Sequence, residues 1–392
     1  MIVLSGPWLS PHFVKTVRNN NWPLVDAGGA AEFLGSEPPN LLSSEQAAQE
    51  VLADGMGRLL TSGEHALGWV AENLVGTQAA NAAELFKDKA AFRKLLEPIF
   101  PEVSFYEVPL GELSTHSPAN DMYPFVVKPS VGFFSIGVHT VRSPTEWQRV
   151  RQNMADEVAS AGRYFPDHML SQTRILFETL IEGGEYAVDA YFDAEGDPVV
   201  LNILEHRYAS PEDVSDRLYV SSKDIIESLA PAAAEFLAEV GRRVPVRNFP
   251  LHAEFRRTPG GRLIPIEINP LRFGGWCTTG DFAHFAWGFN TYELFMKCSK
   301  PDWQAVFEGK ENNEYALVVL DNATGTPGQQ IRVFDYDTLV RRFSRPLHLS
   351  RMDFREFPLF GFLFCEIQPG CEDELEWILG TNLAEFVESG SA

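Results

Sequence analysis

The segment from position 252 to 269 constrains the fold most strongly, because it predicts a β-hairpin with acidic side chains on one face. Gly260-Gly261 separates two apolar, strand-like runs, and such a pair is a favoured two-residue hairpin turn. With that turn, Glu254 lies directly opposite Glu267, and His252 lies opposite Asn269. Strand alternation then puts all four side chains on the same face of the sheet.

Two carboxylates that face each other in a sheet repel, so the hairpin requires a cation or a raised pKa. Two carboxylates and an amide oxygen are hard ligands that suit Mg²⁺ beside a polyphosphate. We therefore predict Glu254, Glu267 and Asn269 as metal ligands. Two alternatives stay open, namely a register one residue away and neutralisation of the pair by a cation such as Arg262.

A glycine- and serine-rich loop is the second candidate site. It lies between the predicted strands Pro124–Lys128 and Gly137–Val141. Glycines free its backbone, and its hydroxyls and amides can face phosphate oxygens, with a lysine at its root as a point charge. The residues predicted to bind phosphate here are Lys128, Ser130, Gly132, Ser135 and Gly137. An ordinary hairpin with a serine-rich tip is the alternative.

A third candidate follows the predicted strand Ile175–Ile181, which ends at Gly183-Gly184. Glu185 comes seven positions after Glu178. We predict that Glu178 and the backbone of Leu180 and Ile181 hold a purine, while Glu185 accepts from ribose hydroxyls, as carboxylates do in dinucleotide sites. A strand that ends in a solvated acidic turn is the alternative.

Cations elsewhere add to these candidates. Asp88 is a predicted N-cap, which puts Lys89 in the first turn of a helix, where the helix dipole disfavours a cation unless an anion is near. Arg272 lies in a glycine-containing segment after Asn269, and its guanidinium can bind a carboxylate or an acyl phosphate through two hydrogen bonds. A surface arginine is the alternative. Weaker cleft candidates are Glu205-His206-Arg207 and Asp216-Arg217.

The distribution of strand-like and helix-like runs predicts an α/β protein with α+β lobes. At 392 residues the chain exceeds one typical domain. Residues 1–86 alternate short apolar runs with helix-like stretches, which indicates a small α/β domain. In residues 87–300 strand-like runs outnumber helices. Residues 301–392 form a small strand-rich lobe with a helix predicted near Asp373–Val387.

Composition excludes several classes of protein. The formal net charge is -22 and no dense Lys/Arg run occurs, which argues against a nucleic-acid or anionic-membrane surface. We expect a cytoplasmic protein, because we find neither a signal peptide nor a run of roughly 18 apolar residues. The four cysteines form no CxxC pair and are expected to be free, buried thiols; they are Cys277, Cys298, Cys365 and Cys371.

The order of these motifs resembles the ATP-grasp superfamily, which includes D-alanine:D-alanine ligases and biotin carboxylases. The resemblance covers about residues 87–300 and implies a preceding α/β domain. It implies that Lys89 and Lys128 contact ATP phosphates, that Glu185 holds the ribose, and that the hairpin acids with Asn269 bind two Mg²⁺ ions, with Mn²⁺ as an alternative. His252 stands where D-alanine ligases have arginine, so a D-alanine substrate is not implied.

By this resemblance, a substrate carboxylate attacks the γ-phosphate of ATP, which gives an acyl phosphate and ADP. An amine then displaces phosphate to form an amide. The expected protein is an ATP-dependent ligase of small-molecule acids and amines, with Lys128 and Arg272 as catalytic groups and a homodimer as one possible assembly. The alternatives are a kinase-like phosphotransferase on the same fold and a non-catalytic ATP-binding sensor.

Overall fold

The computed structural model describes residues 1–35, 38, 40–54, 57–130, 137–161, 174–210, 213 and 215–389. The chain divides into two compact units. The first comprises residues 1–81, 184–255 and 269–392, and the second comprises residues 82–183 and 256–268. The segment boundaries expected from the sequence, between 86 and 87 and between 300 and 301, stay a prediction.

The first unit begins with a parallel sheet of four short strands in the order β3-β2-β1-β4. Ser10 caps the first helix, since its side chain accepts from the amide of Phe13. Ile2 and Leu4 of the central strand pack in one core cluster with Phe13. The elements are β1 (Ile2–Leu4), α1 (Pro11–Asn20), β2 (Leu24–Asp26), η1 (Ala31–Leu34), β3 (Leu41–Leu42), α2 (Ser44–Asp54), β4 (Leu60–Thr61), η2 (Glu64–Ala66) and α3 (Leu67–Asn73), followed by α4 (Gln78–Lys87), within which the unit boundary falls. The α/β character expected for this part is confirmed.

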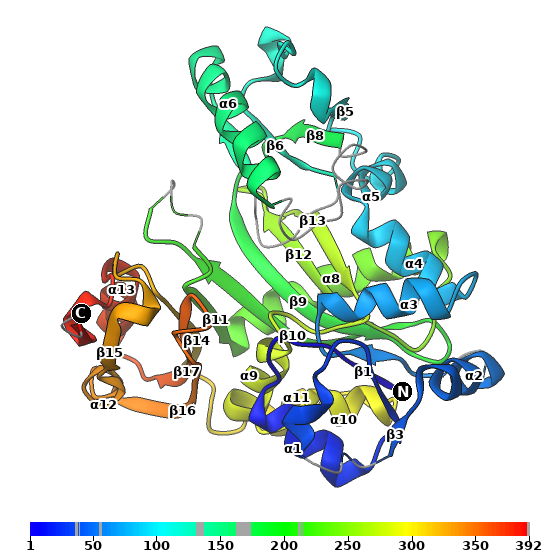
Figure 1. The fold of residues 1–392 in the computed structure, drawn as a ribbon, viewed down its shortest axis with the longest axis vertical. Helices are drawn as coiled ribbons and strands as arrows, with labels where there is room; N and C mark the ends of the chain where they lie inside the picture. Colours follow the sequence, from blue (N-terminus) through cyan, green and yellow to red (C-terminus); the bar gives the residue numbers. More distant parts are fainter. Residues whose placement is uncertain are drawn as a thin grey trace. The chain divides into compact units, whose positions relative to one another are not determined.

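An eight-stranded sheet in the order β13-β12-β9-β10-β11-β14-β17-β16 makes up much of the rest of this unit (Figure 1). Its strands are β9 (Gly184–Phe192), β10 (Pro198–Arg207), β11 (Leu218–Ser222), β12 (Phe249–Arg257), β13 (Leu263–Pro270), β14 (Glu314–Asp321), β16 (Arg345–Arg351) and β17 (Leu359–Ile367). Helix α8 (Lys223–Arg243) packs on β10 and β11, and α9 (Thr278–Trp287) packs on β10, β14, β16 and β17. The unit boundary falls inside β12 and β13.

The C-terminal part corrects one expectation. The helix predicted near Asp373–Val387 ends at Gly380, and Leu383 has a φ of 65°. A left-handed residue interrupts helical geometry, so the chain continues as a short turn and a strand. The remaining elements are α10 (Thr291–Met296), α11 (Trp303–Phe307), η6 (Gly328–Gln330), β15 (Ile331–Phe334), α12 (Tyr336–Val340), α13 (Asp373–Gly380), η7 (Ala384–Phe386) and β18 (Val387–Ser389), with β18 paired antiparallel to β15.

The second unit contains an antiparallel sheet in the order β5-β8-β6-β7. Phe125, Trp147 and Phe177 are the large side chains of its core. The strands and the helix expected here are confirmed to within a few residues. The elements are α5 (Lys89–Leu96), β5 (Phe105–Pro109), η3 (Leu110–Glu112), η4 (Asn120–Met122), β6 (Phe125–Pro129), β7 (His139–Val141), α6 (Pro144–Ala161) and β8 (Arg174–Thr179).

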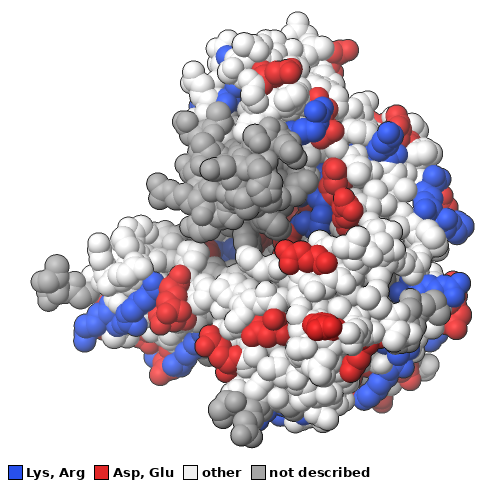
Figure 2. Space-filling model, turned by 45° about the vertical axis from the view of Figure 1, so that its right-hand side comes forward, with Lys and Arg blue, Asp and Glu red and all other residues white. Residues whose placement is uncertain are grey.

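The structure shows how charged side chains and cysteines are distributed among the described residues. None of the described helices is long and apolar enough to span a membrane. On the face shown in Figure 2, basic side chains lie singly or in small groups beside acidic ones. All four cysteines are free thiols, as expected, but only Cys277 and Cys365 are buried, whereas Cys298 and Cys371 are partly exposed.

Candidate nucleotide and metal site

A buried ion-pair cluster joins three elements of the second unit. Glu178 on β8 lies beside Lys128 on β6, because these strands pair antiparallel. The Lys128 Nζ is 2.5 Å from Glu178 Oε1, and the Nε of Arg93 on α5 donates to Glu178 Oε2 at 2.6 Å. All three side chains are at most 4% exposed. The cluster therefore fixes Lys128 at the root of the predicted phosphate-binding loop.

The two cations of this cluster, Arg93 and Lys128, keep the Glu178 carboxyl group ionised. Burial raises the pKa of Glu178, but Arg93 and Lys128 together lower it to about 2. Burial lowers the pKa of Lys128, and Glu178 opposes that shift. Both carboxylate oxygens are engaged by cations, so Glu178 acts in this structure as the anion that holds Lys128. Its predicted contact with a purine stays a prediction.

Arg93 was missed by the sequence analysis. It lies one helical turn after Lys89 and is buried with Ala90, Phe92 and Leu96 on α5. A lone arginine on the apolar face of a short amphipathic helix was the available signal, because a buried charge requires a partner.

The start of α5 confirms the predicted cap. Asp88 Oδ1 accepts from the amides of Ala90 and Ala91. The anion that lies near Lys89 in the structure is Glu267, whose Oε2 is 3.1 Å from Lys89 Nζ. The amide of Lys89 also donates to the carbonyl of Ser130 at 2.9 Å. A predicted phosphate ligand and a predicted metal ligand are therefore paired within the second unit.

The glycine- and serine-rich loop is described only at its ends. Gly132 and Ser135 lie outside the described residues. Ser130 is buried, and its hydroxyl donates to Glu107 Oε1 at 2.6 Å. Gly137 has a φ of 72°, a conformation that glycine adopts without strain.

The segment after β8 contains the predicted purine-binding backbone. Leu180 and Ile181 are partly buried and belong to no strand. Gly183 has a φ of 131°, and a Cβ at this position would overlap the carbonyl of Arg257. Only glycine fits here, which explains the Gly-Gly pair that ends this segment.

The hairpin turn differs from the expected one. Five residues separate β12 from β13, the amide of Gly261 donates to the carbonyl of Thr258, and that of Thr258 donates to the carbonyl of Arg262. Gly261 has a φ of 82°. This is a turn followed by a left-handed glycine, a common longer hairpin connection. The predicted two-residue turn is wrong, because Gly261 alone takes the left-handed position and shifts pairing at the tip by one residue.

The opposite end of the hairpin has the pairing that the sequence predicts. The amide of Leu271 donates to the carbonyl of Pro250 at 2.8 Å. The Nδ2 of Asn269 donates to Glu254 Oε1 at 3.2 Å, so these two predicted metal ligands are neighbours in the first unit. The opposition of Glu254 and Glu267 stays a prediction.

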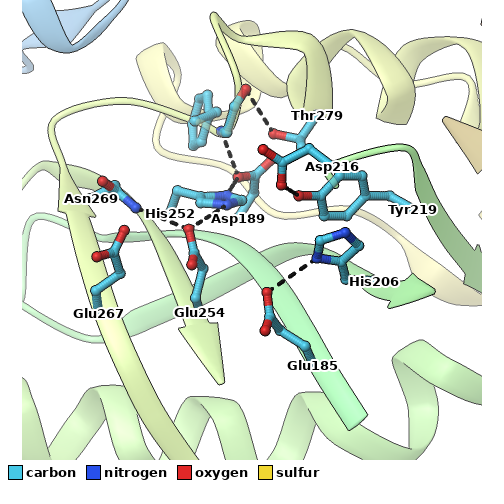
Figure 3. Close-up of polar contacts among 12 residues, drawn as sticks. Glu185, Asp189, His206, Asp216, Tyr219, His252, Glu254, Glu267, Asn269 and Thr279 are labelled. Atoms are coloured by element: carbon cyan, nitrogen blue, oxygen red, sulfur yellow. Dashed lines mark hydrogen bonds and ion pairs between the residues drawn. The ribbon is translucent and has the colours of Figure 1, made fainter. Parts of the chain in front are cut away.

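Asp189 on β9 connects this pair to the loop that precedes α9 (Figure 3). Its Oδ1 is 2.7 Å from His252 Nδ1 and accepts from the amide of Gly274 at 3.1 Å. Because Nδ1 faces a carboxylate, the other ring nitrogen is directed elsewhere and lies 3.8 Å from Glu254 Oε1. Asp189 was not predicted from the sequence, although an acid flanked by apolar residues within a strand was a visible signal.

Glu185, the predicted ribose ligand, pairs with a histidine. Glu185 Oε1 is 3.1 Å from His206 Nδ1, and His206 Nε2 is 2.9 Å from the carbonyl of Ser215. The imidazole stacks on Tyr219 with ring centroids 4.3 Å apart. Burial, then Asp216 and other nearby acids, raise the pKa of the Tyr219 hydroxyl well above its ordinary value. Both ring nitrogens of His206 therefore face oxygen atoms.

Arg272 lies beside an acid of the N-terminal sheet. Its Nη2 is 3.7 Å from Glu64 Oε2, and its side chain is 12% exposed. Leu271, just before it, has a φ of 60° and accepts from the amide and the hydroxyl of Thr61. The arginine is thus held in a defined segment and is not a freely solvated surface residue.

Comparison with known families identifies the kind of domain that contains these residues. Residues 121–280 match the family model described as an ATP-grasp domain. The chain carries an ATP-grasp domain. The matched segment includes every predicted site residue except Lys89, which precedes it.

Solved structures agree with an ATP-grasp fold over nearly the whole chain. The L-amino acid ligase from Bacillus licheniformis is 16% identical with a TM-score of 0.67, covering 100% of this chain and 98% of that chain. N5-carboxyaminoimidazole synthase from Aspergillus clavatus is 13% identical, with a TM-score of 0.65 and 98% of both chains covered. No curated protein sequence matches the chain.

A third similar structure contains a nucleotide. It is the biotin carboxylase domain of the Hydrogenobacter thermophilus 2-oxoglutarate carboxylase, in complex with MgADP and bicarbonate. The identity is 13% and the TM-score 0.63, with 99% of this chain and 90% of that chain covered. Likeness at these identities shows the fold, and the expected ATP-grasp fold is confirmed.

The donor atoms of the ATP-grasp domain suit a hard cation. Among the described residues, no group of three or more His, Cys, Asp or Glu side chains is arranged to hold a metal ion; the predicted set has two glutamates and an asparagine. Glu254 already faces the Asn269 amide, and rotation of that amide presents its oxygen beside the carboxylate. The pair therefore fits Mg²⁺, which prefers oxygen ligands.

Proposed function

We propose that the protein is an ATP-dependent ligase that activates a substrate carboxylate as an acyl phosphate and joins it to an amine. The observation that carries the proposal is the hydrogen-bonded pair of Glu254 and Asn269 inside an ATP-grasp domain. Similar structures named as an L-amino acid ligase and as a carboxylase domain with MgADP support ATP, Mg²⁺ and small acids as ligands. A cytoplasmic location and a homodimer remain predictions from the sequence.

The nucleotide contacts of the proposal follow the order of the motifs. Lys89 and Lys128 neutralise phosphate oxygens, the backbone of Leu180 and Ile181 with Glu178 holds the adenine, and Glu185 accepts from the ribose. The loop residues Ser130, Gly132, Ser135 and Gly137 surround the phosphates. The buried partner Glu178 supports the role of Lys128, because it keeps the ammonium in one place before ATP binds.

Glu254, Glu267 and Asn269 are the proposed ligands of two Mg²⁺ ions, with Mn²⁺ as a substitute. When bound, Mg²⁺ would neutralise negative charge on the phosphoryl oxygens. Glu267 stands two residues before Asn269 in β13, so strand alternation directs both side chains to the same face. His252 lies beside Glu254, and Asp189 supports it there, because Asp189 faces the His252 Nδ1 and also accepts from the amide of Gly274.

The chemistry then proceeds in two displacements. A carboxylate oxygen of the acid bonds to the γ-phosphorus of ATP as the bond from phosphorus to ADP breaks. The amine next attacks the carbonyl carbon, loses a proton, and expels inorganic phosphate. The protein contributes position and charge, and the guanidinium of Arg272 stabilises the acyl phosphate through paired hydrogen bonds.

Trapping with hydroxylamine tests the function whichever amine is the natural acceptor. The wild-type protein is incubated with ATP, Mg²⁺, hydroxylamine and a panel of carboxylic acids, and ADP and hydroxamate are measured together. The ligase proposal requires equal amounts of both with at least one acid. A stable phosphate ester would indicate the kinase alternative, and tight ATP binding without turnover would indicate the sensor.

A matched pair of variants tests the metal set. Glu254→Gln retains an acceptor for Asn269 but removes a charged ligand, so hydroxamate formation is expected to fall at least roughly a hundredfold. Glu195→Gln, at an exposed position after β9, is the control. Binding of Mn²⁺, followed by electron paramagnetic resonance, is expected to weaken only in Glu254→Gln. Equal Mn²⁺ binding in both variants would exclude Glu254 as a ligand.

A further inference from the structure

The carboxyl ends of β1 and β4 in the first unit form a position where ligands commonly bind. Strands β2 and β3 lie on one side of β1, and β4 lies on the other. All the pairs are parallel, so β1 and β4 flank the point where the strand order reverses. In open parallel sheets, ligands bind outside the carboxyl ends of the strands at such a point.

A buried serine at this point has an unsatisfied hydroxyl. Ser5 follows β1 and Ser62 follows β4, and the amide of Ser5 donates to Ser62 Oγ at 2.9 Å. Ser62 Oγ donates in turn to the carbonyl of Ser5. Ser5 is 2% exposed, and its own Oγ has no hydrogen-bond partner among the described residues. A buried hydroxyl without a partner is costly, so a polar ligand group is a natural occupant.

Hydrogen bonds connect this point to the segment that follows β13. The amide of Thr61 donates to the carbonyl of Leu271 at 2.7 Å. The thiol of Cys277 lies 3.6 Å from the carbonyl of Ser62. Glu64, two residues after Ser62, lies beside Arg272. All these residues belong to the first unit, so the switch point adjoins the arginine assigned to the acyl phosphate.

Aromatic side chains surround the same point. The ring of Trp8, just after Ser5-Gly6-Pro7, is 6.3 Å from that of Trp276 and 5.4 Å from that of Phe362. Both tryptophans are partly exposed, whereas Phe362 is buried. Trp276 and Cys277 have φ values of 51° and 66°. Strained backbone of this kind persists where surrounding structure enforces it, most often at ligand sites.

We propose that this switch point binds the donor acid, and that the acid carries a bulky apolar group, either aromatic or branched aliphatic. The inference rests on the proposed ligase function and names its substrate class. Ser5 Oγ and Arg272 contact the polar head, while Trp8 and Trp276 cover the apolar group. Residues 5–8 and 62–64 contain no Lys or Arg, so they add no cation to Arg272, whereas a phosphate group on the acid would require further cationic partners.

The test compares acids of different size in the hydroxylamine assay. The probes are glycine, alanine, leucine, phenylalanine, 3-phenylpropionate and phosphoserine. We expect wild-type kcat/KM to be highest for leucine, phenylalanine or 3-phenylpropionate. Trp8→Ala is expected to lower kcat/KM for these bulky acids by roughly tenfold or more, and to change the values for glycine, alanine and ADP binding little.

Further variants separate loss of the subsite from loss of the fold. Phe33→Ala removes an aromatic ring that is 40% exposed and should leave selectivity unchanged. Ser5→Ala is expected to raise KM for all the acids together. If Trp8→Ala does not fold, Trp8→Phe should shift preference toward the larger acids. A wild-type preference for glycine or phosphoserine, or an equal effect of Trp8→Ala on every acid, would overturn the proposal.

A failure of the ligase proposal can be distinguished from a failure of the subsite proposal. If the wild-type protein forms no hydroxamate with any probe, the ligase function is wrong and the subsite is measured by calorimetry. 3-Phenylpropionate, titrated in the presence of MgADP, should then bind wild type more tightly than Trp8→Ala. Equal binding, or no binding, would overturn the subsite as well.

Discussion

Two buried carboxyl groups, one in each unit, are in opposite electrostatic states. Glu178 in the second unit is 3% exposed and Asp281 in the first is 1% exposed. Glu178 contacts the cations Arg93 and Lys128. Asp281, near the start of α9, accepts instead from the hydroxyl of Tyr292 at 2.6 Å. The pKa of Glu178 is lowered to about 2, whereas that of Asp281 is raised to about 7.

The difference shows that burial does not by itself set the charge of a carboxyl group. Burial raises the pKa in both cases, because a low-dielectric interior disfavours the anion. Two cations overcome this effect at Glu178, while the neutral hydroxyls of Tyr292 and Ser10 only reduce it at Asp281. The charged cluster therefore holds the Lys128 ammonium beside Glu178, and the hydroxyl cluster connects α9 to α10.

The largest expected effect comes from removing the anion of the charged cluster. Glu178→Gln leaves Arg93 and Lys128 buried without their counterion, and breaking such a pair typically costs about 3–5 kcal/mol. We expect the urea midpoint to fall accordingly and MgADP binding to weaken. Glu97→Gln, an exposed position beside the same helix, is the control. Equal midpoints for both variants would show that the cluster is not stabilising.

A smaller effect, with the opposite pH dependence, is expected at Asp281. Its pKa is raised from 3.8 to about 7, so the folded state binds the extra proton and the stabilisation is complete below the unfolded pKa. It is lost as pH rises toward 7. Asp281→Asn should flatten the dependence of the unfolding free energy on pH in this window.

Glu178 provides the contrast for that measurement. Its lowered pKa stabilises the protein above the unfolded value of 4.5, and the stabilisation is lost as pH falls toward about 2. The unfolding free energy, measured with urea from pH 3 to pH 8, should therefore depend on pH in two separate regions, an acid one due to Glu178 and a neutral one due to Asp281. If Asp281→Asn left the pH dependence in the neutral region unchanged, the assignment of that region to Asp281 would be contradicted.

The smallest change in stability is expected for Lys89→Met. The pair of Lys89 with Glu267 is 12% and 21% exposed, and partly solvated pairs contribute about 0–1 kcal/mol. The urea midpoint should barely move, whereas KM for ATP should rise if Lys89 contacts phosphate. Lys94→Met, at an exposed position of the same helix, is the control. A KM for ATP that rises equally in both variants would argue against a specific phosphate contact.

Local sequence patterns predicted much of the fold. The strands that carry Lys128, Glu178 and Glu254 were expected within a few residues, and the cap at Asp88 was correct. These features depend on periodicity and on neighbouring residues. The hairpin turn was wrong, because two adjacent glycines do not reveal which one adopts the left-handed conformation that a longer turn requires.

Partners distant in the sequence explain what the sequence analysis missed. Arg93 is 85 positions from Glu178, and Asp189 is 63 positions from His252. A charged residue in an apolar helix or strand indicates that some partner exists. Its identity depends on which segments pack together, and no local pattern contains that information.

The sequence by itself determined the residue types of the candidate site and the strands that carry them, because side-chain alternation is a local property of the backbone. Only the tertiary structure decided the charges and the partners. Glu178 and Asp281 are both acids in predominantly apolar elements, yet one is ionised beside two cations and the other holds its proton to near neutral pH. Burial and the distance to an opposite charge arise only when distant segments pack.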